Sequence, residues 1–490
     1  MPDKFIEKKI TPKATDYSEW YLDVIEAAEL AEHSPVKGCM IIKPNGYALW
    51  ENSQKILDAW FKETGVENAY FPIFIPERLL AKEKEHVEGF APEVAVVTHA
   101  GGKKLEEPLV IRPTSETIMY EVFSHWIRSY RDLPLLINQW VNVVRWEMHT
   151  RLFLRTTEFL WQEGHTAHET FEEADKRAQM MLDLYKKFAE DYMAIPVIVG
   201  TKTESEKFKG ALYTYSVEAM MQDGKALQFA TSHNLGQNFS KPFDIKFLDR
   251  NNEEKYAWQT SWGLSTRIIG AMIMVHGDDK GLVLPPKIAN IQVVIVPIIT
   301  AEKDRKSVHK KGAEIYEKLK KETDLKIKFD ERDKRPGEKF YEWEKRGVPV
   351  RIEIGIKDIV KEKVVLVRRD TGDKASIHWD ELPRALNQMM EDIQKNLFNR
   401  ALNYQIAKTK KADNWDEFTK AIKGGNFVMA HFSGDEKDEA EIKEKTGATV
   451  RCIPFDHTQD FQPFDAKEEK GKCVYSGKPS KRRVLFAKAY

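Results

Sequence analysis

The pattern of apolar residues changes at Pro285-Pro286, and this change limits the possible folds more than any other sequence feature. Before it, long amphipathic segments and extended segments follow one another without regular alternation, which is typical of an α+β domain with an antiparallel sheet. After it, the nearly continuous apolar strand 291–298 begins an alternation of strands and helices, typical of a small α/β domain. A chain of 490 residues also exceeds the roughly 250–300 residues of a single core, so several domains are expected.

We therefore expect domains over 1–286, 287–409 and 410–490. In the first, apolar periodicity predicts helices over 17–33, 48–63, 115–130 and 169–193, and extended segments over 134–144 and 153–161. The β-rich stretch Ala69–Pro76 is broken by Pro72 and Pro76, so it should lie at a sheet edge or an interface. In the second, we expect helices over 303–322 and 380–409, and strands near 326–330, 350–355 and 363–368. The third is charge-rich, with a short strand at Phe427–Phe432 and a basic terminal strand.

Composition excludes several classes of protein. Lys+Arg and Asp+Glu both total 77, so the chain is no bulk polycation, although local basic patches could still bind nucleic acid. The charged N-terminus is not a signal peptide, and no stretch approaches the roughly 20 apolar residues of a membrane span. The longest apolar runs, Ile291–Ile299 and Ile268–Val275, have the length of buried strands. Only three cysteines occur, which fits a reducing compartment, and we expect a cytoplasmic protein.

Residues 141–168 hold the densest cluster of functional side chains. Two extended segments flank a polar turn near 148–152, which predicts a hairpin. Alternation along the strands should place Arg145 and Glu147 on one face, and Trp161, Glu163 and His165 on one face. A solvated amphipathic hairpin is the alternative. The neighbouring Trp, Val-Val and Phe-Leu residues instead favour burial, and buried charges need partners or ligands.

Three further clusters lie at 110–120, 232–240 and 262–279. In the first, Thr114 and Ser115 before Glu116 could simply cap a helix. In the last, Arg267 could be a surface anchor, or it could hold a phosphate beside small residues. The sequence contains no GxxxxGK[ST] loop, no GxGxxG after a strand and no HExxH helix. The segment His276–Asp279 is more simply explained as a polar turn than as a metal site.

Taken in order, RPTSE, RWE, LRT-x-EFLWQEGHT, TSH-x-LGQNFSK, SWGLSTR and VHGDD resemble the motifs of class II aminoacyl-tRNA synthetases. Specifically, the chain resembles prolyl-tRNA synthetases of the eukaryotic and archaeal type over essentially its whole length. The helix at 48–63 and the strand through Pro76 are similar to motif 1, which forms the homodimer. Residues 145–147 are similar to motif 2. GLSTR and the helix expected after it are similar to motif 3, with Arg267 as its arginine.

The resemblance implies that an α+β catalytic domain, an α/β anticodon-binding domain and a small α+β C-terminal domain act together. They would activate L-proline with ATP and Mg²⁺ to prolyl-adenylate, and then transfer it to the 3′ end of tRNA(Pro). This reaction builds charge on phosphorus and needs positioned cations more than a nucleophile. By similarity, Arg145 bridges the α-phosphate and the proline carboxylate, and Arg267 faces the γ-phosphate. The implied ATP-binding residues are Arg145, Glu147, Arg155, Thr156, Gln228, Thr231 and Arg267.

For proline, the resemblance implies that Thr114, Glu116 and Glu163 meet the secondary ammonium. The implied wall around the ring is Phe90, Trp161, His165, Phe208, His233 and Ser265. Aromatic faces and carboxylates suit a cation. In the anticodon-binding region, the implied base-reading residues are Glu344, Arg351, Lys357 and Asp358, of which each could equally be a solvated side chain.

Two departures from the wider family are informative. Too few residues separate motifs 2 and 3 for the editing domain of the bacterial type, so we expect some mischarging with alanine. Relatives often bind zinc through four cysteines in the C-terminal domain. Here the matching positions are Cys452, His457, Cys473 and Ser476, and with at most three ligands we expect no zinc and no other resident metal.

Two other functions remain as alternatives. A threonyl-type enzyme would need a Cys/His triad in the catalytic core, where only Cys39 is available. A catalytically inactive synthetase-like protein that binds RNA or partners should have lost Arg145, Glu116 or Arg267, and all three are present.

Overall fold

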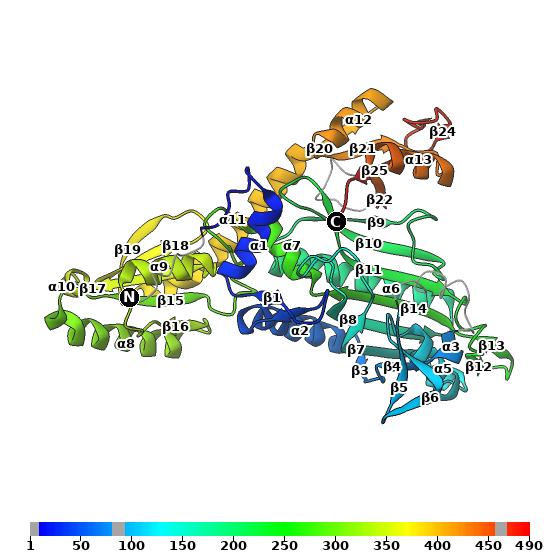
Figure 1. Ribbon diagram of the computed structural model, residues 1–490, viewed down its shortest axis with the longest axis horizontal. Helices are drawn as coiled ribbons and strands as arrows, with labels where there is room; N and C mark the ends of the chain where they lie inside the picture. The colour runs from blue at the N-terminus through cyan, green and yellow to red at the C-terminus, as the bar shows by residue number, and fades with distance from the viewer. Residues whose placement is uncertain (1–8, 81–93, 456–467) are drawn as a thin grey trace.

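The central sheet carries the architecture of the protein (Figure 1). The computed structural model describes residues 9–80, 94–455 and 468–490. The strands of the sheet in its N-terminal part are β3 (Glu67–Asn68), β7 (Leu135–Val144), β8 (Glu158–His168), β9 (Val197–Thr201), β10 (Tyr213–Met220), β11 (Ala226–Gly236) and β14 (Trp258–Ser265). Their order is β9-β10-β11-β14-β8-β7-β3. All neighbours are antiparallel except β3 and β7, which confirms the predicted α+β class.

Long helices cover this sheet. They are α1 (Tyr17–Ala27), α2 (Pro44–Glu63), α6 (Phe171–Lys187) and α7 (Arg267–His276). Helix α6 begins where the Thr170 hydroxyl accepts from the Glu173 N–H, and its face with Ala174, Ala178 and Tyr185 is buried on the sheet. The predicted helix 17–33 ends early, because Glu29 has φ 54° and the chain continues as β1 (Ala31–His33), which pairs with β2 (Met40–Ile42).

The apolar run Ile268–Val275 has the length of a buried strand, but it is helical, as the segment after Arg267 was expected to be. Helix α7 packs between α1, α2, β11 and β14. Because neighbours cover every side of this helix, all of its residues after Arg267 are buried, and the usual amphipathic period disappears.

A small sheet next to the central one has the order β4-β6-β5. It consists of β4 (Phe74–Pro76), β6 (Lys103–Ile111) and β5 (Ala95–Ala100). The proline-broken stretch 69–76 thus gives an edge strand, as predicted, although only its last residues pair. Further short elements are α3 (Glu77–Leu80), α5 (Glu116–Trp126), η2 (Tyr130–Asp132), η3 (Phe188–Tyr192), β12 (Lys246–Leu248) and β13 (Glu254–Tyr256).

The α/β unit that follows has a mixed sheet of order β16-β15-β17-β18-β19. Strands β15, β16 and β17 are parallel, and β18 and β19 are antiparallel. The strands are β15 (Val293–Ile298), β16 (Ile327–Phe329), β17 (Val350–Gly355), β18 (Lys363–Arg368) and β19 (Lys374–His378). The helices are η4 (Glu302–Asp304), α8 (Arg305–Glu322), α9 (Pro336–Lys345), α10 (Ile356–Val360) and α11 (Leu382–Lys408).

The C-terminal unit extends the central sheet. Strand β22 (Thr449–Pro454) pairs with β9, and β25 (Arg483–Ala487), β21 (Phe427–His431) and β20 (Thr409–Ala412) follow outward. Figure 1 shows this unit, with α12 (Trp415–Lys423) and α13 (Glu436–Thr446), beyond the β9 side of the sheet. The short strands β23 (Gly471–Lys472) and β24 (Pro479–Ser480) complete it. Among the described residues, no helix is long and apolar enough to cross a bilayer.

Candidate active site

The predicted hairpin is formed by β7 and β8, but its loop is longer than predicted and covers residues 145–157. Arg145, Glu147 and Arg155 lie in this loop, so the prediction that strand alternation places Arg145 and Glu147 was wrong. The loop is held because the Arg145 N–H donates to the Thr157 carbonyl at 2.8 Å. Residues 152–154 in its middle are buried in the core.

Strand register gathers the predicted side chains of the sheet on one face. Along β8 and β14, Trp161 pairs with Ser265, Glu163 with Gly263 and His165 with Ser261. Along β14 and β11, Gly263 pairs with Thr231 and Ser261 with His233. Since residues two apart share a face, these side chains form adjacent rows over the sheet.

These rows form the floor of a cavity of about 270 Å³. Twelve sequence-predicted residues line it: Thr114, Glu116, Arg145, Trp161, Glu163, His165, Phe208, Gln228, Thr231, His233, Ser265 and Arg267. The size suits a small ligand with several polar contacts.

One end of the cavity is acidic and buried. Glu163 is 3% exposed; one of its oxygens accepts from the Gln139 amide at 2.6 Å and also from the Ser115 hydroxyl. Glu116, 4% exposed, accepts from the Thr114 hydroxyl. These hydrogen bonds hold both carboxylates in place, and the two negative charges lie close together at the cavity wall.

Two histidines respond differently to this environment. Burial opposes the charge on His165, but its hydrogen bond to Glu163 at 3.1 Å and the charge of Glu116 raise its pKa. Burial lowers the pKa of His233 to about 4, so this ring is neutral near pH 7. Among the described residues, Glu116, Glu163 and His165 form the one group of acidic and imidazole side chains close enough together to hold a metal ion.

The other end of the cavity is basic. The Arg145 guanidinium lies 5.6 Å from the Phe159 ring and 5.4 Å from the Trp161 ring, and its Nε donates to the Pro113 carbonyl at 3.0 Å. Arg267 comes from the start of α7 and donates to the Leu154 carbonyl at 3.1 Å. Burial and the nearby charges of Arg145 and Arg155 lower the pKa of Arg267 to about 10, which leaves it a cation at pH 7.

A β-bulge places Gln228 beside Thr231. The pairing of β10 with β11 shifts between Val217 and Glu218, so that Phe229 is an extra residue in β11. Without the bulge, Gln228 and Thr231 would point to opposite faces, whereas both now line the cavity.

Some predicted residues do not reach the cavity. Arg155 is exposed and forms an ion pair with Glu147 at 2.9 Å. The Thr156 hydroxyl donates to the Glu158 carbonyl at 2.7 Å. None of these three residues lines the cavity. Phe90 lies outside the described residues.

Some residues that line or support the cavity were not predicted from the sequence. Glu206 and Lys207 line the cavity from the loop between β9 and β10. Gln139 could have been found from its place in β7, directly opposite Glu163, but only if the hairpin register were known. Tyr120, whose hydroxyl lies 3.0 Å from His165 Nδ1, follows Glu116 by one helical turn.

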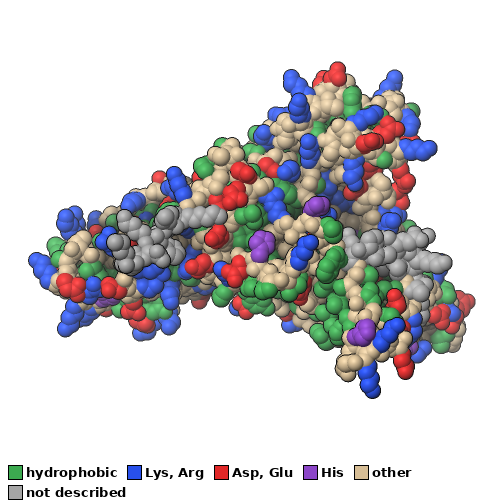
Figure 2. All heavy atoms as spheres, in the orientation of Figure 1, with side chains coloured by type: hydrophobic (Ala, Val, Ile, Leu, Met, Phe, Trp, Pro, Cys, Tyr) green, Lys and Arg blue, Asp and Glu red, His purple; other side chains and the backbone are tan. Residues whose placement is uncertain are grey.

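The predicted base-reading residues divide into two groups. Glu344 and Arg351 line a recess of about 190 Å³ in the α/β unit, together with Lys280, Arg369 and others. Lys357 and Asp358 lie in α10, outside that recess, and Asp358 caps the helix by accepting from the Gly355 N–H at 2.8 Å. On the face shown in Figure 2, Lys and Arg side chains lie among Asp and Glu over this unit, without a uniform basic patch.

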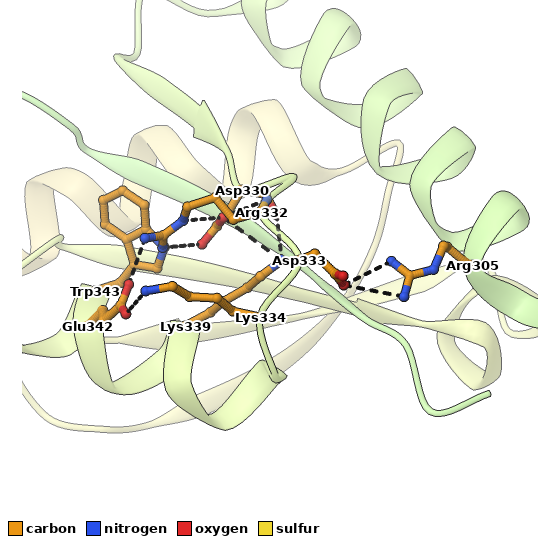
Figure 3. A network of polar contacts seen from close by, with 8 residues as sticks. All are labelled: Arg305, Asp330, Arg332, Asp333, Lys334, Lys339, Glu342 and Trp343. Carbon is orange, nitrogen blue, oxygen red and sulfur yellow. Dashed lines mark hydrogen bonds and ion pairs between the residues drawn. The ribbon is translucent and has the colours of Figure 1, made fainter. Parts of the chain in front are cut away.

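A buried carboxylate fixes helix α9 beside that recess (Figure 3). Asp330 is 1% exposed and accepts from Arg332 at 2.7 and 2.8 Å and from the Trp343 indole at 2.7 Å. Burial opposes its charge, but these hydrogen bonds lower the pKa of Asp330 to about 2. Trp343, held in this way, also lines the recess.

Comparisons with known proteins agree with this arrangement. Residues 98–276 match the family described as tRNA synthetase class II core domain (G, H, P, S and T), and residues 292–389 match the anticodon binding domain. The antiparallel sheet, its cavity and these two matches define a class II aminoacyl-tRNA synthetase. Residues 415–490 match prolyl-tRNA synthetase, C-terminal.

Full-length relatives narrow the assignment. The chain is 55% identical to a proline–tRNA ligase of Chloroherpeton thalassium, over 99% of this chain and 100% of the relative. It is 54% identical to the proline–tRNA ligase of Chlorobaculum tepidum, over 98% and 99%, and 53% identical to that of Phocaeicola vulgatus, over 99% of each. The chain belongs to the prolyl-tRNA synthetase family.

Proposed function

We propose that this chain activates L-proline with ATP to prolyl-adenylate and transfers it to the 3′ end of tRNA(Pro). The observation that carries the proposal is the polarity of the cavity. Arg145 lies beside Trp161, and Arg267 follows Ser265, which pairs with Trp161. Glu116 and Glu163 lie together with His165, which pairs with β14 four residues farther along. An amino-acid carboxylate and a triphosphate would meet the cations, while an ammonium would meet the acids.

The acidic end suits the secondary ammonium of proline. Glu116 and Glu163 are buried carboxylates that accept hydrogen bonds from Thr114 and Gln139, and an incoming ammonium would add a charged donor to them. Thr114 adds a hydroxyl. His165 Nε2 donates to Glu163 and so carries a proton where a metal ligand would need a lone pair. We therefore assign the group formed with His165 to the ammonium rather than to a metal ion. The proposed ring contacts are Trp161, His165, Phe208, His233, Ser265 and, outside the described residues, Phe90.

The basic end suits the triphosphate. Arg145 lies beside the aromatic wall, where it could reach both the α-phosphate and the proline carboxylate, and Arg267 would hold the γ-phosphate. Gln228 and Thr231 would contact the ribose and phosphates. Glu147, Arg155 and Thr156 stay proposed ATP contacts, which would require the loop 145–157 to close over the nucleotide.

Mg²⁺ would enter the cavity together with ATP. Mg²⁺ prefers oxygen ligands and commonly binds through one or two carboxylates and substrate phosphates. Glu206, Gln228 and Thr231 offer such oxygen atoms in the cavity wall. When bound with ATP, the ion would neutralise charge on the departing pyrophosphate.

Zinc is a different case, and we propose that the C-terminal unit holds none. Cys452 packs with Met220 and Leu485, while Cys473 belongs to a separate apolar cluster around Phe418. The Ser476 hydroxyl donates to Asp438 at 2.5 Å and is thus engaged elsewhere. His457 lies outside the described residues. Elemental analysis of purified protein tests the proposal, which one zinc per chain would overturn.

Binding of tRNA(Pro) is proposed to involve the α/β unit. Glu344 and Arg351, beside the ring of Trp343, offer the polar edges and aromatic surface that unstacked bases require. Lys357 and Asp358 stay proposed contacts outside that recess. Substituting Glu344 by Ala should raise the KM for tRNA(Pro) without changing proline activation.

We also propose domain boundaries after residues 286 and 409. The apolar cores of the α/β unit and of the C-terminal unit are separate clusters, which supports three units. The second boundary nevertheless falls inside β20, whose sheet continues into the first unit.

We further propose that this synthetase is of the eukaryotic and archaeal type, that it forms a homodimer and that it acts in the cytoplasm. From β8 to β14 the described chain forms helix α6 and strands of the core, which leaves no room for an inserted editing domain and supports the eukaryotic and archaeal type. The relatives with 53–55% identity come from bacteria, so the name of this type would refer to the domain architecture of the enzyme and not to the organism that contains it. Tyr47, Tyr70 and Phe74 are 42%, 74% and 45% exposed near α2 and β4, which supports a dimer through this surface.

Exchange of labelled pyrophosphate into ATP tests the proposed activity. We expect exchange that depends on proline, and charging of tRNA(Pro) when tRNA is added. Absence of exchange at high enzyme and proline concentrations would favour the alternative, a synthetase-like protein that binds RNA or partners without catalysis.

A further inference from the structure

The loop 202–208, between β9 and β10, forms part of the cavity wall. Its residues Glu206, Lys207 and Phe208 line the cavity. The Phe208 ring lies 4.8 Å from the His233 ring. The backbone N–H of Phe208 donates to the Thr214 hydroxyl at 3.0 Å. The same hydroxyl lies 2.8 Å from His233 Nδ1. The position of this loop therefore sets the position of Phe208 against His233, and both residues are proposed to surround proline.

A carboxylate from the C-terminal unit holds the start of this loop. Glu439, on α13, is 5% exposed. One of its oxygens accepts from the Thr203 hydroxyl at 3.0 Å, and the other accepts from the Ser205 hydroxyl. Thr203 in turn accepts from the Lys207 N–H at 2.9 Å and so closes the turn that leads to Phe208.

A buried cluster of charged residues also joins this loop to the C-terminal unit. Glu218 in β10 is fully buried and accepts from Lys202 at 2.7 Å and from Arg451 of β22 at 3.0 Å. Lys202 also donates to the Arg451 carbonyl at 2.6 Å. Because this cluster already joins the two units, loss of the Glu439 contacts should loosen the loop without separating the units.

We propose that Glu439 is a positioning residue for proline binding, through which the C-terminal unit holds the loop 202–208 against the cavity. The carboxylate acts by bridging Thr203 and Ser205, so that Phe208 stays packed on His233. The inference rests on the proposed function, because it assigns Phe208 and His233 to the proline pocket. It gives the C-terminal unit an indirect part in amino-acid binding, through this loop.

The test is pyrophosphate exchange with Glu439→Ala and Thr203→Val, with Glu444→Ala as the control. Glu444 is exposed on the same helix. Loss of the hydrogen bonds to a buried carboxylate should raise the KM for proline about tenfold, with kcat at saturating proline changed less than about twofold. The KM for ATP should stay unchanged. Glu439→Ala and Thr203→Val together should cost no more than Glu439→Ala alone, because Glu439→Ala already removes the contact with Thr203.

Three results separate the possible explanations. Glu439→Gln, which keeps one accepting oxygen, should recover part of the proline affinity. If Glu439→Ala unfolds, Thr203→Val combined with Ser205→Ala decides, since these changes remove only the two loop hydroxyls that Glu439 bridges. An unchanged proline KM in this double variant would overturn the inference while leaving the proposed function intact. An inactive wild-type enzyme would reject the proposed function, and this inference with it.

Discussion

Substitution of Glu163 by Gln should separate proline binding from ATP binding. Glu163 lies in the middle of β8, is 3% exposed and faces the cavity beside Glu116. Its carboxylate accepts from Gln139, Ser115 and His165. Gln has nearly the same shape and keeps one accepting oxygen, so the fold should survive while the charge is lost.

The expected size follows from these contacts. Breaking one partner of a buried, hydrogen-bonded charge pair costs about 2–5 kcal/mol. Since Glu116 remains to meet the ammonium, we expect a value near the lower half of that range, about 3 kcal/mol, or roughly a 100-fold rise in the KM for proline. The KM for ATP should change less than about threefold, because the triphosphate is expected at the other end of the cavity.

Pyrophosphate exchange at varied proline and ATP concentrations measures both values. Glu158→Gln is the matched control, because Glu158 begins the same strand but is exposed. The pKa of His165, which the hydrogen bond to Glu163 helps to raise, should fall in the variant, as NMR titration can show. A proline KM unchanged within twofold would refute the assignment of the acidic end.

Three other perturbations have defined outcomes. Arg145→Ala should lower the exchange rate about 100- to 1,000-fold with unchanged circular dichroism, and an unaltered rate would remove Arg145 from the mechanism. Asp330→Ala should lower the free energy of unfolding of the α/β unit by about 3 kcal/mol, against less than about 0.5 kcal/mol for the exposed Asp333→Ala. Urea unfolding measures both, and equal effects would contradict the role of the buried network. Burial lowers the pKa of His276 from 6.5 to about 3, so the unfolded chain binds the proton first as the pH falls. Stability should therefore be full above pH 6.5 and fall below it by up to about 1.4 kcal/mol per pH unit. His276→Gln should lose less stability between pH 7 and 5 than the wild type, and identical losses would contradict this.

The sequence predicted those parts of the site that depend on local periodicity. The common face of Trp161, Glu163 and His165 follows from alternation within β8 alone. The strands β17 and β18 were also predictable, because apolar runs bounded by turns are local signals.

Features that depend on distant pairing were not predictable. The register that places Thr231 and His233 beside β14, and the bulge that turns Gln228 into the cavity, arise between strands far apart in sequence. The loop 145–157 looked like a continuation of its strands, because it contains the buried residues 152–154. Glu439 lies 236 residues from Thr203 in a charge-rich segment, so the sequence gives no sign of their contact.

A crystal structure with a non-hydrolysable prolyl-adenylate analogue tests the central claim most directly. We expect the proline ammonium within hydrogen-bond distance of Glu116 and Glu163, and the α-phosphate group in contact with Arg145. An analogue bound with its ring and ammonium away from both carboxylates would contradict the account, even if the enzyme were active.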